Sequence, residues 1–276
     1  MGAKPPSGLS RTVGAIEHPP ILTVPGVSDH VLYTWIVMAV LFVLSFAATR
    51  HLELVPRGVQ NVMEVVLEQF LALLDDVIGH DGRRYLPLIA TLGLFILVSN
   101  LLGLIPGLVA PTGNLNTTAA CALIVFIAYH AIGVRKVGLL PYLKHFAGPL
   151  LGAELFPNRV VDVAFKLILV PLFVVIEIFS HLARPLSLAL RLFGNMAGGH
   201  ILLAVMFLLT MGMVGWAFSG SLGAVLLGLP GALLLIAFTS WFLFPLKLLV
   251  ALLQAFIFCM LSMLYIAGAA QEAEHH

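Results

Sequence analysis

Acidic side chains are missing from a long C-terminal stretch of this chain. Between Ile178 and Gln271 there is no Asp or Glu, and the charged side chains are Arg184, Arg191 and Lys247. Charge is scarce throughout, with 10% charged residues, 61% hydrophobic residues and a mean hydropathy of +1.07. This composition excludes a soluble or disordered chain and indicates a polytopic membrane protein. Its isolated cations must find their counter-charge elsewhere, and another subunit is the best source.

Cysteine is also nearly absent. Cys121 and Cys259 both lie inside apolar runs and have no CxxC or Cys/His spacing, so they are expected to be small buried hydrophobic residues. The start of the chain lacks a Ser or Thr at the myristoylation position, and no apolar core follows within the length of a signal peptide. The first apolar run is therefore expected to be a retained anchor.

Long apolar runs predict an all-α fold with one membrane domain over residues 1–276. A polar segment (1–30) is expected before a first span (31–49). An amphipathic pattern over 59–79 favours a helix at the membrane surface. Two further spans are expected within 85–134, from about Tyr85 to Leu108 and from about Thr117 to Val134. A pair of long runs over 160–270, interrupted by prolines, predicts a tilted helical hairpin that carries an ion path.

The helix around Arg191 has one small, polar and cationic face. At 100° per residue, several small, polar or cationic residues fall within about 60° of Arg191. They are Arg184, Ser187, Gly194, Asn195 and Gly198. Small residues allow another helix to approach closely in a membrane, so a passing helix could bring its side chains against the guanidinium. The alternative is an arginine that pairs within its own bundle.

Two other polar groups accompany this face. On the last helix, Gln254 shares a line with Lys247. Upstream, Glu177 and His181 stand four residues apart, where they could hold or pass a proton, and Ser180 lies beside them. His200 is nine residues beyond Arg191, on roughly the opposite helical face.

Two segments carry a family resemblance. Residues 188–196 read LALRLFGNM and residues 253–258 read LQAFIF. With them, the chain from about Tyr85 to its C-terminus resembles subunit a of the F-type ATP synthase, the stator half of its membrane ion channel. The resemblance implies that the helical hairpin packs against a ring of c subunits.

The resemblance also implies a role for each residue. Arg191 would face an essential carboxylate on the rotating c-ring and separate two offset aqueous half-channels, which pass protons to and from the ring. Sodium stays open as the coupling ion. The site residues implied with it are Asn195, Gln254, His200, Glu177 and Ser180, and Lys247 stands at a further family position.

Partners follow from the same resemblance: the c-ring, peripheral-stalk b subunits, the whole ATP synthase complex and membrane lipid. No nucleic acid, cofactor or metal is implied. The chain itself is expected to catalyse no reaction. The N-terminal sequence favours a bacterial inner membrane.

Two positions depart from the family pattern. Lys247 stands where the family usually complements the residue at 200 with His or Glu. A lysine amine can pass on a proton only where burial or a neighbouring cation makes the ammonium a stronger acid. Gly103 stands where some members place an acid. The entry half-channel is therefore expected to depend more on water, Asn100, Asn116 and His200.

Two other classes of membrane protein fit the sequence less well. A secondary transporter could also use an arginine at the membrane midplane, but such transporters commonly show inverted repeats, and none is evident. An intramembrane metalloenzyme would need clustered ligands, and the sequence has no HExxH motif.

Basic loops predict the orientation of the chain. Arginines follow the first span, and Arg135 and Lys136 follow the third, whereas the 107–116 loop has no Lys or Arg. The N-terminus is therefore expected outside the cell. A reporter fused near Thr112 should be exterior and one near Lys136 cytoplasmic. Labelling of both sites from the same side would contradict this orientation.

Overall fold

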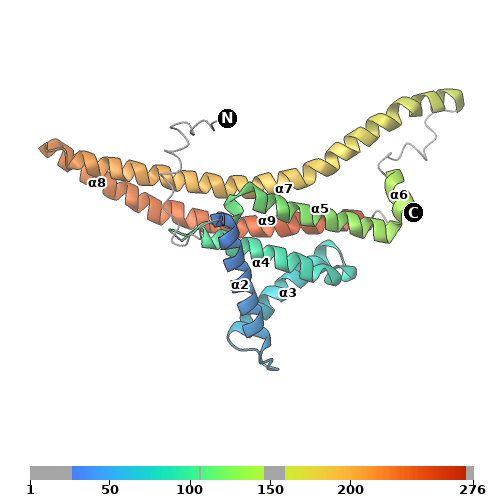
Figure 1. Ribbon diagram of the computed structural model, residues 1–276, viewed down its shortest axis with the longest axis horizontal. Coiled ribbons are helices and arrows are strands. Elements are labelled where there is room, and N and C mark those ends of the chain that lie inside the picture. Colours follow the sequence, from blue (N-terminus) through green and yellow to red (C-terminus); the bar gives the residue numbers. More distant parts are fainter. Residues whose placement is uncertain (1–26, 106, 146–158, 272–276) are drawn as a thin grey trace. The chain divides into compact units, whose positions relative to one another are not determined.

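The computed structural model describes residues 27–105, 107–145 and 159–271. Within these residues the chain forms helices and no strand (Figure 1). Most of the expected polar N-terminal segment, up to residue 26, lies outside the described residues. The predicted all-α, polytopic fold is confirmed, because five helices are long and apolar enough to cross a membrane.

The helices follow the apolar runs of the sequence. In chain order they are α2 (Asp29–Thr49), α3 (Val59–Val77), η1 (His80–Tyr85), α4 (Leu86–Leu102), η2 (Pro111–Gly113), α5 (Leu115–Val137), α6 (Leu139–His145), α7 (Arg159–Ala217), α8 (Leu222–Phe238), the π-helical segment η4 (Thr239–Leu243) and α9 (Phe244–Gln271). α4 ends six residues before the span expected from hydropathy. The expected hairpin corresponds to α7 on one side and the continuous run α8–η4–α9 on the other.

α7 is far longer than one perpendicular crossing requires. Its 59 residues span about 88 Å at 1.5 Å per residue, against a hydrocarbon core of about 30 Å. It stays helical through Pro171 and Pro185, although each ring removes one backbone hydrogen bond. Only 6% of its most apolar window is buried inside the chain. A helix of this length and exposure fits a bilayer only if it is steeply tilted.

The turn between α7 and α8 is built from two local signals. Gly220 has φ +93°, a conformation that favours glycine. Ser221 then caps α8, because its Oγ accepts a hydrogen bond from the backbone N–H of Ala224 at 3.1 Å. The chain thus reverses direction within four residues, which brings α7 and α8 side by side.

The described chain divides into two compact units. Of the described residues, one unit contains 27–55, 93–105, 107–117 and 192–256, and the other contains 56–92, 118–145, 159–191 and 257–271. In the first unit, Ile96, Asn100, Thr112 and Leu192 are among the buried residues. The second unit has a core of Leu74, Ile89, Tyr129, Cys259, Met263, Ile266 and Ala269. Both cysteines are buried and free, as expected.

α3 carries the acidic side chains of the amphipathic segment. Glu64 accepts a hydrogen bond from Gln60 Nε2 at 2.7 Å, and Asp75 pairs with Arg83 at 3.0 Å. Leu74 on the other face is fully buried in the core of the second unit. α3 therefore packs through an apolar stripe and leaves its charges accessible.

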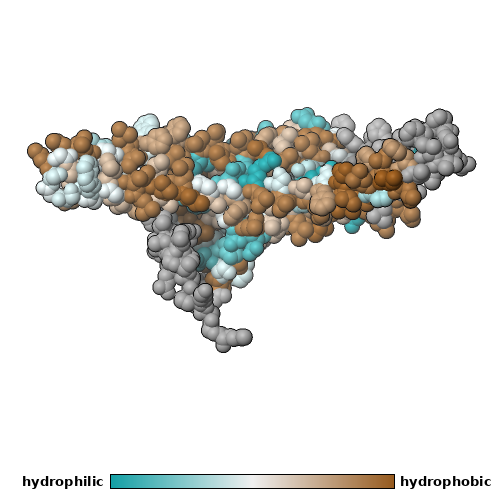
Figure 2. All heavy atoms as spheres, turned by 90° about the horizontal axis from the view of Figure 1, so that it is seen from above, coloured by the Kyte–Doolittle hydropathy of each residue, from teal (hydrophilic) through white to brown (hydrophobic). Residues whose placement is uncertain are grey.

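The surface of the described residues is mainly hydrophobic. Figure 2 shows broad brown areas with hydrophilic residues gathered in smaller regions. Large apolar side chains such as Phe42, Leu167 and Trp241 are more than half exposed. Exposed apolar patches of this extent suit lipid or a protein partner rather than water.

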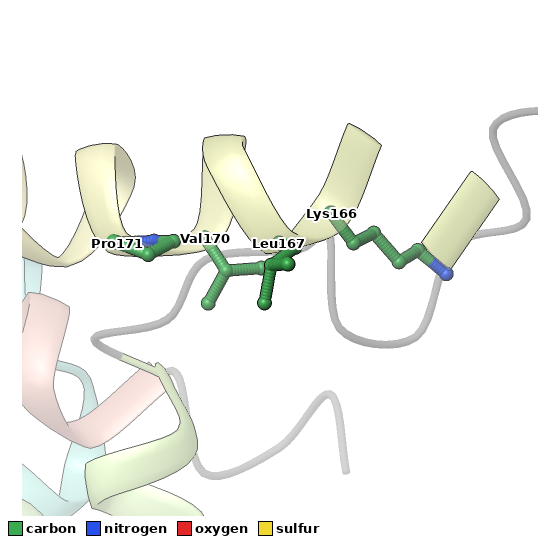
Figure 3. A pocket seen from close by; sticks show the side chains of 4 residues that line it. All are labelled: Lys166, Leu167, Val170 and Pro171. Atoms are coloured by element: carbon green, nitrogen blue, oxygen red, sulfur yellow. The ribbon is translucent and has the colours of Figure 1, made fainter. Parts of the chain in front are cut away.

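A shallow depression on α7 is lined by Lys166, Leu167, Val170 and Pro171 (Figure 3). All four residues come from one helix, and Lys166 Nζ is paired with Asp162 at 2.8 Å. An open, mostly apolar groove with its one cation already neutralised offers little for recognition of a ligand.

At Gly228, α8 packs closely against α7. A Cβ there would lie 2.7 Å from Ala217 Cβ and 2.9 Å from the backbone oxygen of Met213. Gly228→Ala should therefore destabilise the hairpin by about 1–3 kcal/mol through overpacking. The measurement is thermal unfolding in mild detergent, followed by circular dichroism.

Gly212→Ala is the matched control. Gly212 also lies inside a helix but has nothing within 4 Å of its Cβ position. The substitution should be neutral or stabilise by up to about 1 kcal/mol through helix propensity. Equal unfolding temperatures for the two variants would show that α7 and α8 are not in close contact at Gly228.

Candidate functional site

Arg191 lies on the exposed face of α7. Ser187, Gly194, Asn195 and Gly198 are exposed with it, and Arg184 is half-buried. The face next to it is anchored in the protein by Leu188, Leu192 and Met196, which lie about 60° to 140° round the helix from Arg191 and are at most 5% exposed. The small, polar and cationic face expected from the helical wheel thus points away from the chain's own core.

Among the described residues, no hydrogen bond or ion pair is found for the Arg191 guanidinium. Arg184, two turns earlier, differs because its guanidinium lies 5.7 Å from the centroid of the Tyr265 ring. It also lies close enough to Tyr129 and His181 to interact with both electrostatically. Of the two cations, Arg191 is the one without a hydrogen bond, ion pair or ring contact to another described side chain.

Asn195 and Gln254 form a direct amide pair between α7 and α9. Asn195 Nδ2 donates to Gln254 Oε1 at 2.5 Å. Gln254 is 2% exposed, and its Nε2 has no hydrogen-bond partner among the described residues. The pair fixes the register of the two helices one turn after Arg191 and leaves one buried donor available.

Asn100 is held from both ends of its amide. Its Nδ2 donates to the backbone oxygen of Ala251 at 3.3 Å, and its Oδ1 accepts from Thr112 Oγ1 at 2.7 Å. Asn100 and Thr112 are fully buried. This network connects α4 and η2 to α9, so Asn100 has a structural role in holding these elements together.

Lys247 and His200 are brought into the same compact unit. A Cβ at Gly199 would lie 2.8 Å from Lys247 Cε, so the lysine stem runs against the backbone beside His200. Lys247 Nζ is buried and has no hydrogen-bond partner in the described part of the chain. A buried amine left in this way is costly unless water or an ion reaches it.

Gly103 departs from the family pattern at a point of very close packing. A Cβ there would lie 2.5 Å from Ala110 Cβ and 3.4 Å from His200 Nε2. The imidazole of His200 therefore occupies the neighbourhood that a side chain at position 103 would enter. The absence of a side chain at Gly103 therefore leaves room for the imidazole of His200.

The second polar group gathers around His181. Its Nε2 lies 3.1 Å from Glu177 Oε1, and its Nδ1 lies 3.0 Å from the hydroxyl of Tyr129 on α5. Ser180 is exposed on α7 beside them. Sequence reasoning identified the Glu177–His181 spacing but missed Tyr129, a polar aromatic residue near the basic end of an apolar span. The signal that could have found it is a polar aromatic side chain inside an otherwise apolar span.

Asn116 is a predicted site residue that contacts neither the Asn195–Gln254 pair nor the group around His181. It is exposed near the start of α5, and its backbone N–H donates to Asn114 Oδ1 at 2.8 Å. Asn114 in turn lies 3.3 Å from His30 Nδ1 of α2. Thr112, which sequence reasoning also missed, is the residue of this loop that reaches Asn100.

The sequence resembles one group of known proteins. Residues 31–267 match the model of a family described as "ATP synthase A chain". The chain is 43% identical to "ATP synthase subunit a 1" of Pelobacter propionicus, with 89% of each chain covered. It is 42% identical to "ATP synthase subunit a" of Geobacter sulfurreducens, again over 89% of each. For "ATP synthase subunit a 2" of Syntrophotalea carbinolica the identity is 45%, over 90% of this chain and 88% of the relative.

The Asn100 network leads to a stability prediction. Asn100→Leu would leave Thr112 Oγ1 and the Ala251 carbonyl without their buried partner, and should cost about 1–3 kcal/mol. Thr112→Val removes one bond and should cost less. Asn116→Ala, at an exposed position, should change stability by less than about 0.5 kcal/mol. Thermal unfolding in detergent measures all three, and an Asn100→Leu variant as stable as Asn116→Ala would remove the structural role given to Asn100.

Proposed function

The chain belongs to the ATP synthase A chain family, and on this premise we propose that it is the ion-conducting stator subunit of an F-type ATP synthase. In this role it provides two offset half-channels that pass protons to and from carboxylates on a c-ring. Proton flow through the half-channels drives rotation of the ring and hence ATP synthesis. One observation carries the proposal: Arg191 stands on an exposed face of small and polar residues with no partner among the described residues.

The chemistry of arginine suits this role. An arginine side chain is charged at any physiological pH, so it attracts a ring carboxylate and favours its ionised form. The ring's proton is therefore released where the carboxylate meets Arg191. The same charge repels a proton that would cross directly between the half-channels. A proton then passes only by riding the ring, and each charge moved through 100 mV makes about 2.3 kcal/mol available for rotation.

The other site residues divide between the two half-channels in this proposal. His200 and Lys247, with Asn116 toward the outside, line the entry path. Glu177 and Ser180 line the exit path. Asn195 and Gln254 hold the helices that present Arg191, and their distance of 2.5 Å supports that role. The free Lys247 Nζ and Gln254 Nε2 support water in the entry path, because buried donors need a partner.

The partners proposed are the c-ring at the Arg191 face, the peripheral-stalk b subunits and lipid around the exposed apolar helices. The proposed location is the inner membrane of a bacterium, with the N-terminus outside. The five spans and the family place the chain in a membrane as a multi-pass protein. No observation favours the alternative of a secondary transporter.

Replacement of Arg191 tests the proposal most directly. Arg191→Ala should leave the complex assembled, because the side chain is exposed and bonds to no described residue. It should abolish ATP-driven proton pumping in inverted vesicles. Arg191→Lys should fail largely too, because lysine is a compact, strongly hydrated charge that lacks the planar fork of arginine. Pumping is measured as ATP-dependent acidification, with copurification of the ring and the soluble head as the assembly check.

Ser187→Ala is the matched control, since Ser187 lies on the same exposed face one turn earlier and carries no charge. It should pump near the parental rate. The proposed function is wrong if assembled Arg191→Ala vesicles also pump near that rate.

A further inference from the structure

A line of three hydrogen-bonded side chains runs from α5 to α7 within the second compact unit. The Tyr129 hydroxyl is 3.0 Å from His181 Nδ1, and His181 Nε2 is 3.1 Å from Glu177 Oε1. Tyr129 is 1% exposed and His181 8% exposed. The Glu177 side chain is 32% exposed. The line therefore begins at a carboxylate that is partly accessible on α7 and ends at a phenol in the core.

Other elements surround the imidazole with titratable and charged groups. His130 of α5 has its ring centroid 5.2 Å from that of His181, and its Nδ1 lies 2.9 Å from the Phe126 backbone oxygen. Tyr142 of α6 lies 6.0 Å from His130, and Tyr265 of α9 lies 6.0 Å from Tyr129, both between ring centroids. Arg184 approaches from α7 itself. Among the described residues that contact this cluster, Glu177 is the acidic one, and its negative charge favours a protonated His181.

This arrangement can take up a proton without moving a heavy atom. When His181 is neutral with its hydrogen on Nδ1, it donates to the Tyr129 oxygen, and its bare Nε2 faces Glu177. A proton that Glu177 has taken up passes to Nε2, and the imidazolium then donates from Nδ1 to Tyr129 and from Nε2 to the Glu177 carboxylate. The phenol thus holds the imidazole in place in both states, because its oxygen accepts from Nδ1–H in each.

The line also lies between Arg191 and the basic end of α5. His181 precedes Arg191 by ten residues on α7, roughly 15 Å along the helix axis. Tyr129 stands less than two turns before Arg135 and Lys136, in the last turn of α5. Pro185 has no N–H for the carbonyl of His181, so the helix ladder is open at this point. A proton that leaves a site beside Arg191 toward the basic side would pass this region.

We propose that His181 is a proton relay of the half-channel on the basic side, and that Tyr129 is the positioning residue that keeps its imidazole aligned with Glu177. This inference rests on the proposed function and adds two residues to it. One proton is taken up by the Glu177–His181 pair from the ring side, and one is released to water on the basic side. No other bond is made or broken, and no electron is transferred.

The experiment measures passive proton conduction in inverted vesicles of the whole complex, after the soluble head has been stripped off. His181→Gln keeps a polar side chain that can bond to Tyr129 and Glu177 but cannot take up a proton. Conduction should fall about a hundredfold or more, the lower end of the range for loss of a positioned acid–base group. Tyr129→Phe keeps the ring and removes the hydroxyl, and it should cause a smaller loss.

His130→Gln is the matched control. This histidine lies in the same cluster, but its Nδ1 bonds to its own helix backbone rather than to the line. Its replacement should leave conduction near the parental level. Equal losses for His130→Gln and His181→Gln would overturn the proposal, because a general disturbance of the cluster would then explain both.

Chemical rescue separates a relay from a structural role. His181→Ala vesicles should regain conduction when imidazole is added, but not when pyrazole is added, because pyrazole has the same size and is a far weaker base. Rescue by both compounds alike, or by neither, assigns His181 a structural role and overturns the proposal. The same holds if His181→Gln conducts like the parent.

Failure of the proposed function gives a different result. In that case Arg191→Ala vesicles still pump, whatever the His181 variants do. If Arg191→Ala abolishes pumping while the His181 variants conduct normally, the stator function stands and the relay assignment alone is wrong.

Discussion

A fixed positive charge in an apolar segment must be stabilised by something, and most of the arrangement around Arg191 can be understood from that constraint. At mid-bilayer such a charge costs roughly 2.5–3.5 kcal/mol on insertion scales. No described residue of the chain neutralises it. Instead, Leu188, Leu192 and Met196 anchor α7 on the neighbouring face, and glycine and serine positions beside Arg191 leave room in front. The helix therefore presents a charge whose stabilisation has to come from outside the described residues.

The buried polar side chains on either side of this face fall into two kinds. Some are satisfied within the chain, as Asn100 is by Thr112 and by the Ala251 backbone, and these hold helices in register. Others are incompletely satisfied within the described residues, as Lys247 Nζ and Gln254 Nε2 are. Unsatisfied donors in a low-dielectric interior are costly, so they persist where water or an ion is at hand. Under the proposed function, the satisfied side chains hold the helices together and the incompletely satisfied ones lie where water would enter.

Much of the fold was predictable, because a bilayer imposes length and polarity on every segment that crosses it. The apolar runs predicted α2, α5 and the two long C-terminal helical runs to within a few residues. The prolines did not break those runs, because a proline inside a long apolar helix costs one hydrogen bond and a bend rather than the whole helix. The end of α4 at Leu102 was not predictable from hydropathy, since the residues after it are equally apolar but turn away from the helix. Tyr129 and Thr112 were missed because each acts through a partner distant in sequence.

The sequence by itself determined the membrane class, the helical periodicity that gathers Ser187, Arg191 and Asn195 on one face, and the absence of any acid near them in the chain. These are properties of composition and of 3.6 residues per turn, and they need no tertiary contact. Only the tertiary structure decided that this face is exposed while the Gln254 side of α9 is buried. It also decided that Asn195 pairs with Gln254 and that a phenol of α5 meets His181. Those facts depend on which helices pack together, and helix packing is set by side-chain shape between segments far apart in the sequence.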